Sequence, residues 1–262
     1  MRVVALTFHD IVEDAAAAAA HGDSFYRLTV AEMESLLSRL KKNGYPTVSS
    51  KAFRAWQQGS DALPEHAVVF TFDDGYTSHL EHAASLLIRY RFTGTFFVTP
   101  EKIGKPGYLN WEQLKKLVFL GMEIGSHGLT HRPLTQLPRA VLENELVQSK
   151  RMLETQLGVP VHSIAAPGGF WNATVAEAAK EAGYDAFWIS TMGMNGKETN
   201  PMALRRIVVR TPIEIGRIVS MVEGQTPAFW LAGSQQTVIH LLKRILGVYW
   251  YERLKRRIVP NA

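Results

Sequence analysis

The sequence predicts an α/β protein built on a largely parallel sheet or barrel. Segments with the pattern of a strand alternate with segments with the pattern of a helix over nearly the whole chain, and this order is typical of parallel strands joined by helices. The chain has 262 residues, of which 46% are hydrophobic, and barrels of this length commonly form one domain. We find no sequence repeat and no long linker, so we expect a single domain.

The elements begin with a short apolar strand at residues 3–8. Residues 15–20 are alanines, which we interpret as part of a loop because they offer no amphipathic face. Thr29 and Glu32 have the spacing of a capping box and start a helix that ends near Asn43. The pattern then predicts strands at residues 68–72, 95–99, 122–125, 161–165, 186–189 and 207–209, and helices at 78–90, from Asn110 to near Gly121, at 138–157 and at 173–182.

The composition excludes several kinds of site and compartment. The chain has no cysteine, which removes disulfides, thiolate metal sites and cysteine nucleophiles, so any metal must be held by His, Asp or Glu. The first residues lack the apolar stretch and cleavage site of a secretory signal. No apolar run approaches the roughly 20 residues that cross a bilayer. We therefore expect a cytoplasmic protein, soluble or peripheral at the inner membrane face.

The formal charge of +5 is concentrated in the last part of the chain. From His240 onward there are six basic residues against Glu252 alone, which leaves 23 basic and 23 acidic residues in the rest. A nucleic-acid surface is therefore not expected. We assign residues 1–235 to the barrel and 236–262 to a basic amphipathic helix, part of that domain or appended to it. This helix either docks on the barrel or lies on an anionic membrane.

Two adjacent carboxylates follow the strand predicted at residues 68–72. Asp73 and Asp74 stand in the sequence TFDDG, which begins at Thr71. The carboxyl ends of buried strands are where α/β barrels place their active sites, and successive side chains there point in different directions. The two carboxylates can therefore hold separate roles. The same residues also suit a turn followed by a helix start, so the motif alone leaves both interpretations open.

His127 and His131 follow another predicted strand, in the sequence SHGLTH. Two histidines four residues apart can bind one metal ion, and imidazole is a good ligand for zinc, nickel or cobalt. A carboxylate would complete a three-ligand site with open positions. The spacing also occurs without a metal, but the nearby aspartates support the metal interpretation. His79, His82 and His162 lack ligand spacing with any group we identify, and we assign them no role.

The two motifs together, TFDDG and SHGLTH some fifty residues later, resemble those of the NodB-homology polysaccharide deacetylases, the family-4 carbohydrate esterases. The resemblance covers most of residues 1 to about 210. It implies a distorted (β/α) barrel that removes N-acetyl groups from hexosamine units of a glycan or glycoconjugate. It also implies one divalent metal ion, with zinc as the first candidate and nickel or cobalt as alternatives. By the same resemblance Asp73 is the catalytic base, and Asp74, His127 and His131 are the metal ligands.

The family's general acid is a histidine in a Leu-x-His motif near the carboxyl end, which this chain lacks. LTFHD at residues 6–10 resembles the family's closing strand instead. Some members, such as those acting on poly-N-acetylglucosamine, are circularly permuted so that this strand comes first. Because the first and last strands of a barrel are neighbours, we expect His9 to be the acid in a chain of this permuted type. Thr7 departs from the usual Leu, and a strand-end histidine bonded to a loop is the alternative.

The third motif of the family, Arg-x-Pro-aromatic-Gly, appears in reduced form as AAPGG at residues 165–169. The resemblance implies that the backbone N–H of Gly168, after Pro167, donates to the oxyanion. Trp171 either stacks on a sugar ring or packs at a helix start. The motif's arginine, which orients the base, is missing, and so is its usual aspartate partner. We therefore expect a different, unidentified group to orient Asp73.

The sequence leaves more than one function open. The first is N-deacetylation of a glycan by attack of water, with an aspartate base and a histidine acid at a metal centre. An O-acetyl esterase or another amidohydrolase on the same scaffold is the second. A catalytically silent relative that binds metal or glycan is the third, suggested by the missing arginine. Acetate release from chitooligosaccharides, from acetylated xylan or from neither would separate them.

Overall fold

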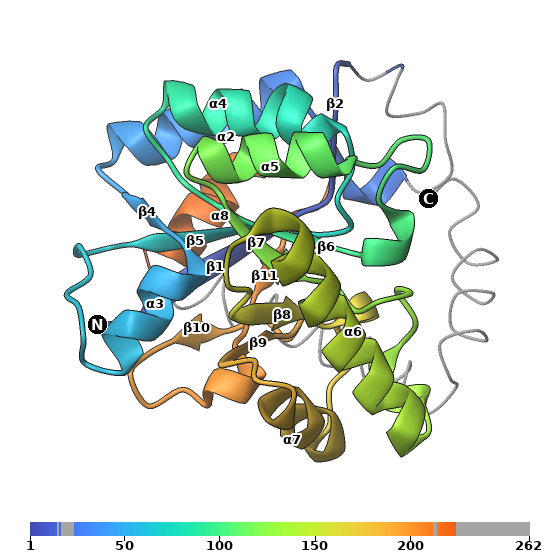
Figure 1. The fold of residues 1–262 in the computed structure, drawn as a ribbon. Coiled ribbons are helices and arrows are strands. Elements are labelled where there is room, and N and C mark those ends of the chain that lie inside the picture. The colour runs from blue at the N-terminus through green and yellow to red at the C-terminus, as the bar shows by residue number, and fades with distance from the viewer. Residues whose placement is uncertain (15, 17–23, 212–213, 224–262) are drawn as a thin grey trace, which may run out of the picture.

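The computed structural model describes residues 1–14, 16, 24–211 and 214–223. The helix predicted at residues 236–262 lies outside the described residues, and so does the alanine stretch apart from Ala16. Between these gaps the chain forms one curled sheet with helices packed around it (Figure 1). No helix in the described part is long and apolar enough to span a membrane.

The sheet runs through the centre of the molecule in the order β10-β1-β5-β6-β7-β8-β9, with β11 also beside β1 and β4 also beside β5. Every pairing within it is parallel except that of β1 with β10. A separate parallel pair is formed by β2 (Asp10–Val12) and β3 (Arg27–Thr29). The sheet strands are β1 (Val3–Phe8), β4 (Thr47–Val48), β5 (Val68–Phe72), β6 (Thr95–Val98), β7 (Glu123–Ser126), β8 (Ser163–Ala165), β9 (Ala186–Trp188), β10 (Met194–Asn195) and β11 (Ile207–Val208).

One short segment, residues 204–208, joins the two ends of the sheet. Leu204 forms a parallel bridge with Trp188 of β9, and its carbonyl accepts the N–H of Ile189 at 2.8 Å. A few residues later Ile207 pairs with Leu6 of β1. The segment therefore closes the curled sheet between β9 and β1, and the predicted distorted (β/α) barrel is confirmed.

Seven helices and one π-helical turn are described around the sheet. The capping box predicted at Thr29 and Glu32 is formed. A second capping box joins Asn110 and Gln113 at the start of the helix predicted there. The helix predicted at residues 78–90 is confirmed, but its first part is π-helical. The helices are α2 (Val30–Lys42), α3 (Ser50–Gln57), η2 (His79–Ala84, π-helical), α4 (Ser85–Arg89), α5 (Trp111–Phe119), α6 (Arg139–Leu157), α7 (Ala173–Glu181) and α8 (Ile215–Val222).

Alternation along the strands decides which side chains point inside the barrel. An inner apolar cluster consists of every second residue of the strands, together with residues of α3. The intervening strand residues point outward and pack against the other helices. Thr7 and Thr71 continue the inner series, and their buried hydroxyls lie 2.9 Å apart. Asp73 is the next inner position after Thr71. The inner members include Val3, Ala5, Val69, Phe97, Ala165, Trp188 and Leu204.

Candidate active site

The structure brings the three predicted metal ligands together at the carboxyl end of the sheet. Asp74 follows β5, whereas His127 and His131 follow β7. Their ligand atoms all lie within 4.8 Å of one another. Asp74 Oδ1 is 2.8 Å from His131 Nε2 and 4.0 Å from His127 Nε2. Residues more than fifty positions apart in sequence thus form one group of a carboxylate and two imidazoles.

Two of these ligands have backbone conformations that side chains rarely adopt. Asp74 has φ 78° and His131 has φ 68°, both in the left-handed region. Gly75 follows with φ 80°, and a Cβ there would lie 3.0 Å from Val98 Cγ1, so this turn requires glycine. Such conformations persist only where the surrounding structure fixes them, and they gather at functional sites. The backbone is therefore shaped to present these two side chains.

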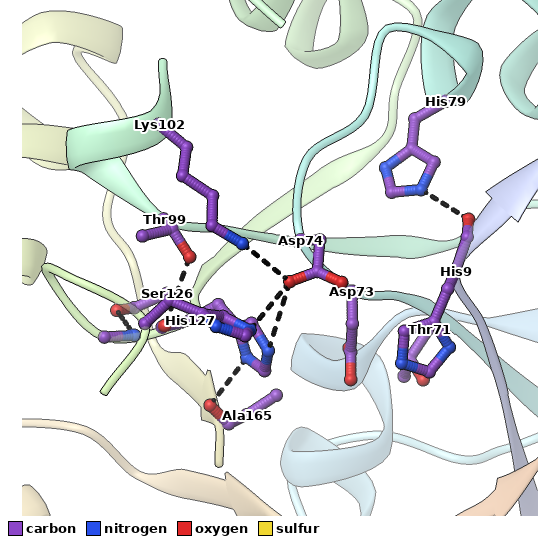
Figure 2. Close-up of polar contacts among 12 residues, drawn as sticks. His9, Thr71, Asp73, Asp74, His79, Thr99, Lys102, Ser126, His127 and Ala165 are labelled. Carbon is purple, nitrogen blue, oxygen red and sulfur yellow. Dashed lines mark hydrogen bonds and ion pairs between the residues drawn. The ribbon is translucent and has the colours of Figure 1, made fainter. Parts of the chain in front are cut away.

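The tautomer of His127 is set by a hydrogen bond between its Nδ1 and the backbone. Its Nδ1 lies 2.9 Å from the carbonyl oxygen of Ala165, and because a carbonyl only accepts, Nδ1 carries the proton. Nε2 is then left with a lone pair on the side of Asp74, as Figure 2 shows. Burial lowers the pKa of His127 to about 4, and the charge of Asp73 offsets only part of this effect. The imidazole is neutral at pH 7, as a metal ligand must be.

A buried carboxylate on α6 holds the loop that carries His131. Glu145 Oε2 accepts the backbone N–H groups of Leu129 at 2.8 Å and Thr130 at 3.0 Å. Its other oxygen accepts the Thr130 hydroxyl at 2.5 Å. These three bonds connect α6 to the turn just before His131. Nothing in the local sequence distinguishes Glu145 from the other glutamates of the same helix, so the sequence does not indicate its role.

The donor set fits a divalent metal ion. One carboxylate and two imidazoles form the kind of three-ligand site that suits zinc, nickel or cobalt and leaves open positions. Burial would raise the pKa of Asp74, but the hydrogen bond from His131 holds it well below its ordinary value. Asp74 is therefore ionised, which is the form that ligates a cation.

Asp73, the predicted base, is held by an arginine that the sequence did not indicate. Arg206 Nη1 donates to Asp73 Oδ1 at 2.7 Å and Nη2 donates to Oδ2 at 2.9 Å. The side chain of Arg206 is 0% exposed and that of Asp73 is 5% exposed. Arg206 Nη1 also donates to Thr71 Oγ1 at 3.3 Å. This is a bidentate arginine–carboxylate ion pair, which fixes both carboxylate oxygens in one plane.

The charge of Asp73 follows from this contact. Burial alone would raise the pKa of Asp73, but the positive charge of Arg206 and the hydrogen bonds from its guanidinium together lower it. Arg206 comes from the segment that closes the barrel, just before β11. It holds both carboxylate oxygens of Asp73, which is the contact expected of the group that would replace the motif arginine. The neighbouring Arg205 is exposed. The sequence shows two adjacent arginines and does not indicate which of them points into the barrel.

His9 lies at the end of β1, beside the strand that leads to Asp73. Its ring is 4.9 Å from that of Tyr26 between centroids, and its backbone carbonyl accepts His79 Nε2–H at 2.8 Å. Its Nδ1 is buried without a hydrogen-bond partner in the described part of the chain, so the ring is not tied to a loop through that nitrogen. Burial lowers the pKa of His9, while the charges of Asp73 and Asp74 oppose this shift.

The residues of the reduced third motif lie in the turn η5 (Pro167–Gly169) after β8. Gly168 is exposed and has φ 66°, and a Cβ there would lie 2.8 Å from Phe170 Cε2. Pro167 is buried. Trp171 donates its indole N–H to the carbonyl of Met202 at 2.6 Å, and it is 38% exposed. The bond anchors one edge of the indole, so both interpretations of Trp171 remain predictions.

Comparisons with known proteins agree with this fold and motif set. Residues 60–187 match the family model described as polysaccharide deacetylase. YxkH of Bacillus subtilis is 28% identical over 183 residues, which are 70% of this chain and 66% of YxkH. The peptidoglycan-N-acetylglucosamine deacetylase of Bacillus cereus is 32% identical over 121 residues, 46% of this chain and 54% of that protein. The poly-beta-1,6-N-acetyl-D-glucosamine N-deacetylase of Escherichia coli is 23% identical over 252 residues, 80% of this chain and 37% of that protein.

Solved structures show the same fold. The Streptococcus pyogenes deacetylase PplD in complex with acetate has a TM-score of 0.77 at 22% identity and covers 84% of this chain and 97% of its own. IcaB from Ammonifex degensii has a TM-score of 0.74 at 23% identity, with 84% and 97% covered. The fold and motifs define a barrel of the carbohydrate esterase type. The resemblance to the NodB-homology polysaccharide deacetylases is confirmed over residues 60–187, just under half of the chain. The chain spans less than two thirds of the length of the three relatives above.

Proposed function

We propose that this protein hydrolyses N-acetyl groups of N-acetylhexosamine units in a glycan or glycoconjugate, with the help of one divalent metal ion. The observation that carries the proposal is the buried pair of Asp73 and Arg206 beside the Asp74, His127 and His131 cluster. This arrangement offers an oriented carboxylate base next to a metal donor set. Two of the relatives are named as deacetylases of N-acetylglucosamine, one in peptidoglycan and one in poly-beta-1,6-N-acetyl-D-glucosamine, which supports the substrate class.

The metal would be held by Asp74, His127 and His131, with zinc as the first candidate and nickel or cobalt as alternatives. When bound, it supplies a Lewis acid that lowers the pKa of water and polarises the acetyl carbonyl. The protein's part is to supply ligands in the right charge state. Asp74 is ionised and His127 is neutral in this arrangement, so neither has to change its protonation state before a metal binds.

The base works on the attacking water. As a water oxygen forms its bond to the acetyl carbon, Asp73 accepts the proton that this water loses. Arg206 occupies both carboxylate oxygens from one side, so the lone pairs that remain are directed toward the substrate. The N–H of Gly168 is assigned to the carbonyl oxygen, on which negative charge develops during the attack.

The acid completes the reaction at the nitrogen. The carbon–nitrogen bond breaks with its electron pair going to nitrogen, and a proton from the His9 ring makes the sugar amine a neutral leaving group. The products are acetate and the free amine. β1 pairs with both β5 and β11, so His9 ends a strand adjacent to the one that carries Asp73. This adjacency supports the acid role of His9 and the permuted order of strands.

Arg206 also favours catalysis over a silent binding role. The third hypothesis rested on the missing arginine of the third motif. A guanidinium nevertheless holds both oxygens of Asp73 in the buried site. A protein that only bound glycans would not need a base fixed in this manner.

Acetate release tests the proposal. The protein, loaded in turn with zinc, nickel and cobalt, is assayed on chitooligosaccharides, on poly-N-acetylglucosamine and on acetylated xylan. We expect release from the first two. Release from xylan alone would favour the O-acetyl esterase, and release from none would favour a silent relative.

Two substitutions then separate the roles of the aspartates. Asp73→Asn should bind metal and lose about two orders of magnitude in turnover, because general-base catalysis contributes on the order of 10²–10⁴-fold. Asp74→Ala should lose both metal and activity. Asp61→Asn, at an exposed aspartate, is the matched control and should change neither. Near-full turnover by Asp73→Asn would show that the proposed base is wrong.

A further inference from the structure

A lysine shares Asp74 with the two histidines. Lys102 is the last residue of the turn η3 (Pro100–Lys102), which follows β6. Its Nζ donates to Asp74 Oδ1 at 3.2 Å, and the side chains of Lys102 and Asp74 are 21% and 9% exposed. In the view of Figure 2, Lys102 reaches Asp74 from the side opposite to Asp73 and His9. None of the family motifs in the sequence includes this residue.

The oxygen that Lys102 contacts is the one nearest the histidine ligands. Asp74 Oδ1 lies 2.8 Å from His131 Nε2, 4.0 Å from His127 Nε2 and 3.2 Å from the Lys102 ammonium. A divalent cation bound by these three ligands needs the same carboxylate. Two cations repel each other strongly at such separations in a partly buried site. The ammonium and the metal ion therefore compete for Asp74.

An aromatic ring offers Lys102 a second position. Its Nζ lies 5.1 Å from the centroid of the Tyr108 ring, at a distance where the face of the ring attracts a cation. Tyr108 is itself stacked on Tyr76, with centroids 5.3 Å apart. The side chain of Lys102 is also partly open to water. When Asp74 is taken by another cation, the ammonium can stay with the ring or solvent without being buried unpaired.

We propose that Lys102 is a built-in counter-ion for Asp74 in the metal-free protein and that metal binding displaces it. Its ammonium stabilises the nearly buried carboxylate of Asp74. The same contact weakens metal binding, since the metal must first break the ion pair. Lys102 is thus a positioning residue that sets the metal affinity of the site. This inference rests on the proposed function, because the ion in question is the one assigned there.

The test compares Lys102→Met with the wild type and with Lys105→Met, which removes the charge of an exposed lysine three residues away. The dissociation constant for Zn²⁺ is measured by competition with a chromophoric chelator, and the Tm is measured with and without Zn²⁺. We expect Lys102→Met to bind Zn²⁺ about tenfold more tightly, a ratio equivalent to about 1.4 kcal/mol. We also expect it to lower the Tm of the metal-free protein. Lys105→Met should resemble the wild type in both.

The outcomes separate this inference from the function on which it rests. If the wild type forms a one-to-one metal complex and Lys102→Met binds Zn²⁺ equally or more weakly, the counter-ion role is wrong while the proposed function stands. An unchanged Tm of metal-free Lys102→Met would also overturn it. If the wild type binds neither Zn²⁺, Ni²⁺ nor Co²⁺, the proposed function fails, and the displacement of Lys102 fails with it.

Discussion

Replacing Arg206 by methionine should cost both stability and activity. The guanidinium is fully buried, and it makes two hydrogen bonds of 2.7 Å and 2.9 Å to Asp73. Methionine fills similar space but leaves a buried carboxylate without its cation. Breaking one side of a buried ion pair destabilises a protein by about 3–5 kcal/mol. We therefore expect the free energy of unfolding of R206M to fall by about that amount.

The same substitution frees the base. Asp73 would keep its place in the chain but lose the contacts that fix the plane of its carboxylate. A displacement of about 1 Å at a reacting group can cost on the order of 100-fold in rate. We expect a loss of that size in acetate release by R206M. R206K should lie between R206M and the wild type, because lysine keeps a charge but cannot bond both oxygens in one plane.

The measurements are denaturant unfolding at pH 7 and acetate release under one metal loading. R205M is the matched control, since Arg205 is the adjacent and exposed arginine, and its stability should stay within about 0.5 kcal/mol of the wild type. The double variant D73N/R206M removes both charges and should recover much of the lost stability but none of the activity. The role we assign to Arg206 is wrong if the free energy of unfolding of R206M lies within about 1 kcal/mol of that of the wild type and R206M retains most of the wild-type turnover.

Three further predictions test other parts of the site. Glu145→Gln should weaken Zn²⁺ binding by about 10–100-fold, because it loosens the loop that carries His131. Glu143→Gln, at an exposed position of the same helix, should leave Zn²⁺ binding unchanged. Equal Zn²⁺ dissociation constants for the two variants would refute the role of Glu145. Burial lowers the pKa of His79 to about 4, so between about pH 6.5 and 4 the unfolded chain binds more protons than the folded one. Stability should then decline as pH falls, by up to about 1.4 kcal/mol per pH unit from this residue, and His79→Gln should show a shallower decline in denaturant unfolding. Gly168→Ala and Gly158→Ala both place alanine at a left-handed φ, 66° and 68°, which should cost about 1 kcal/mol in each. Gly168→Ala should cost more, because its Cβ would also lie 2.8 Å from Phe170 Cε2, and only Gly168→Ala should slow acetate release.

The elements that the sequence predicts well are those whose signals are local. The strand at residues 3–8 and the strand at 68–72 appear with the expected bounds, because a continuous apolar run bounded by polar residues needs no distant partner to be recognised. The helix that begins after Thr29 has its capping box. In contrast, β4 and β10 have two residues each. Each of these two forms beside a longer strand that offers hydrogen bonds, and two residues alone carry no alternation from which the sequence could predict them.

The same distinction separates the parts of the site. His127 and His131 are four residues apart, and Asp73 is next to Asp74, so the spacing within each motif already carries the chemistry. The bond between Arg206 and Asp73 joins residues 133 positions apart. Its only local trace in the sequence is a pair of arginines, Arg205 and Arg206, just before the strand predicted at residues 207–209. Sequence reasoning could state that the base lacked its usual partner, but it could not find the replacement.

The place of Arg206 explains why losing the motif arginine need not silence the site. The segment at residues 204–208 joins β9 to β1 and so closes the barrel, and Arg206 reaches Asp73 from within that closure. An inward-pointing position close enough to Asp73 can deliver a guanidinium to this carboxylate, whichever strand or loop carries it. The chemistry depends on where the charge lies in space and not on its motif. In this protein the segment that completes the sheet also completes the base, so a chain that fails to close there should lose its oriented base together with its fold.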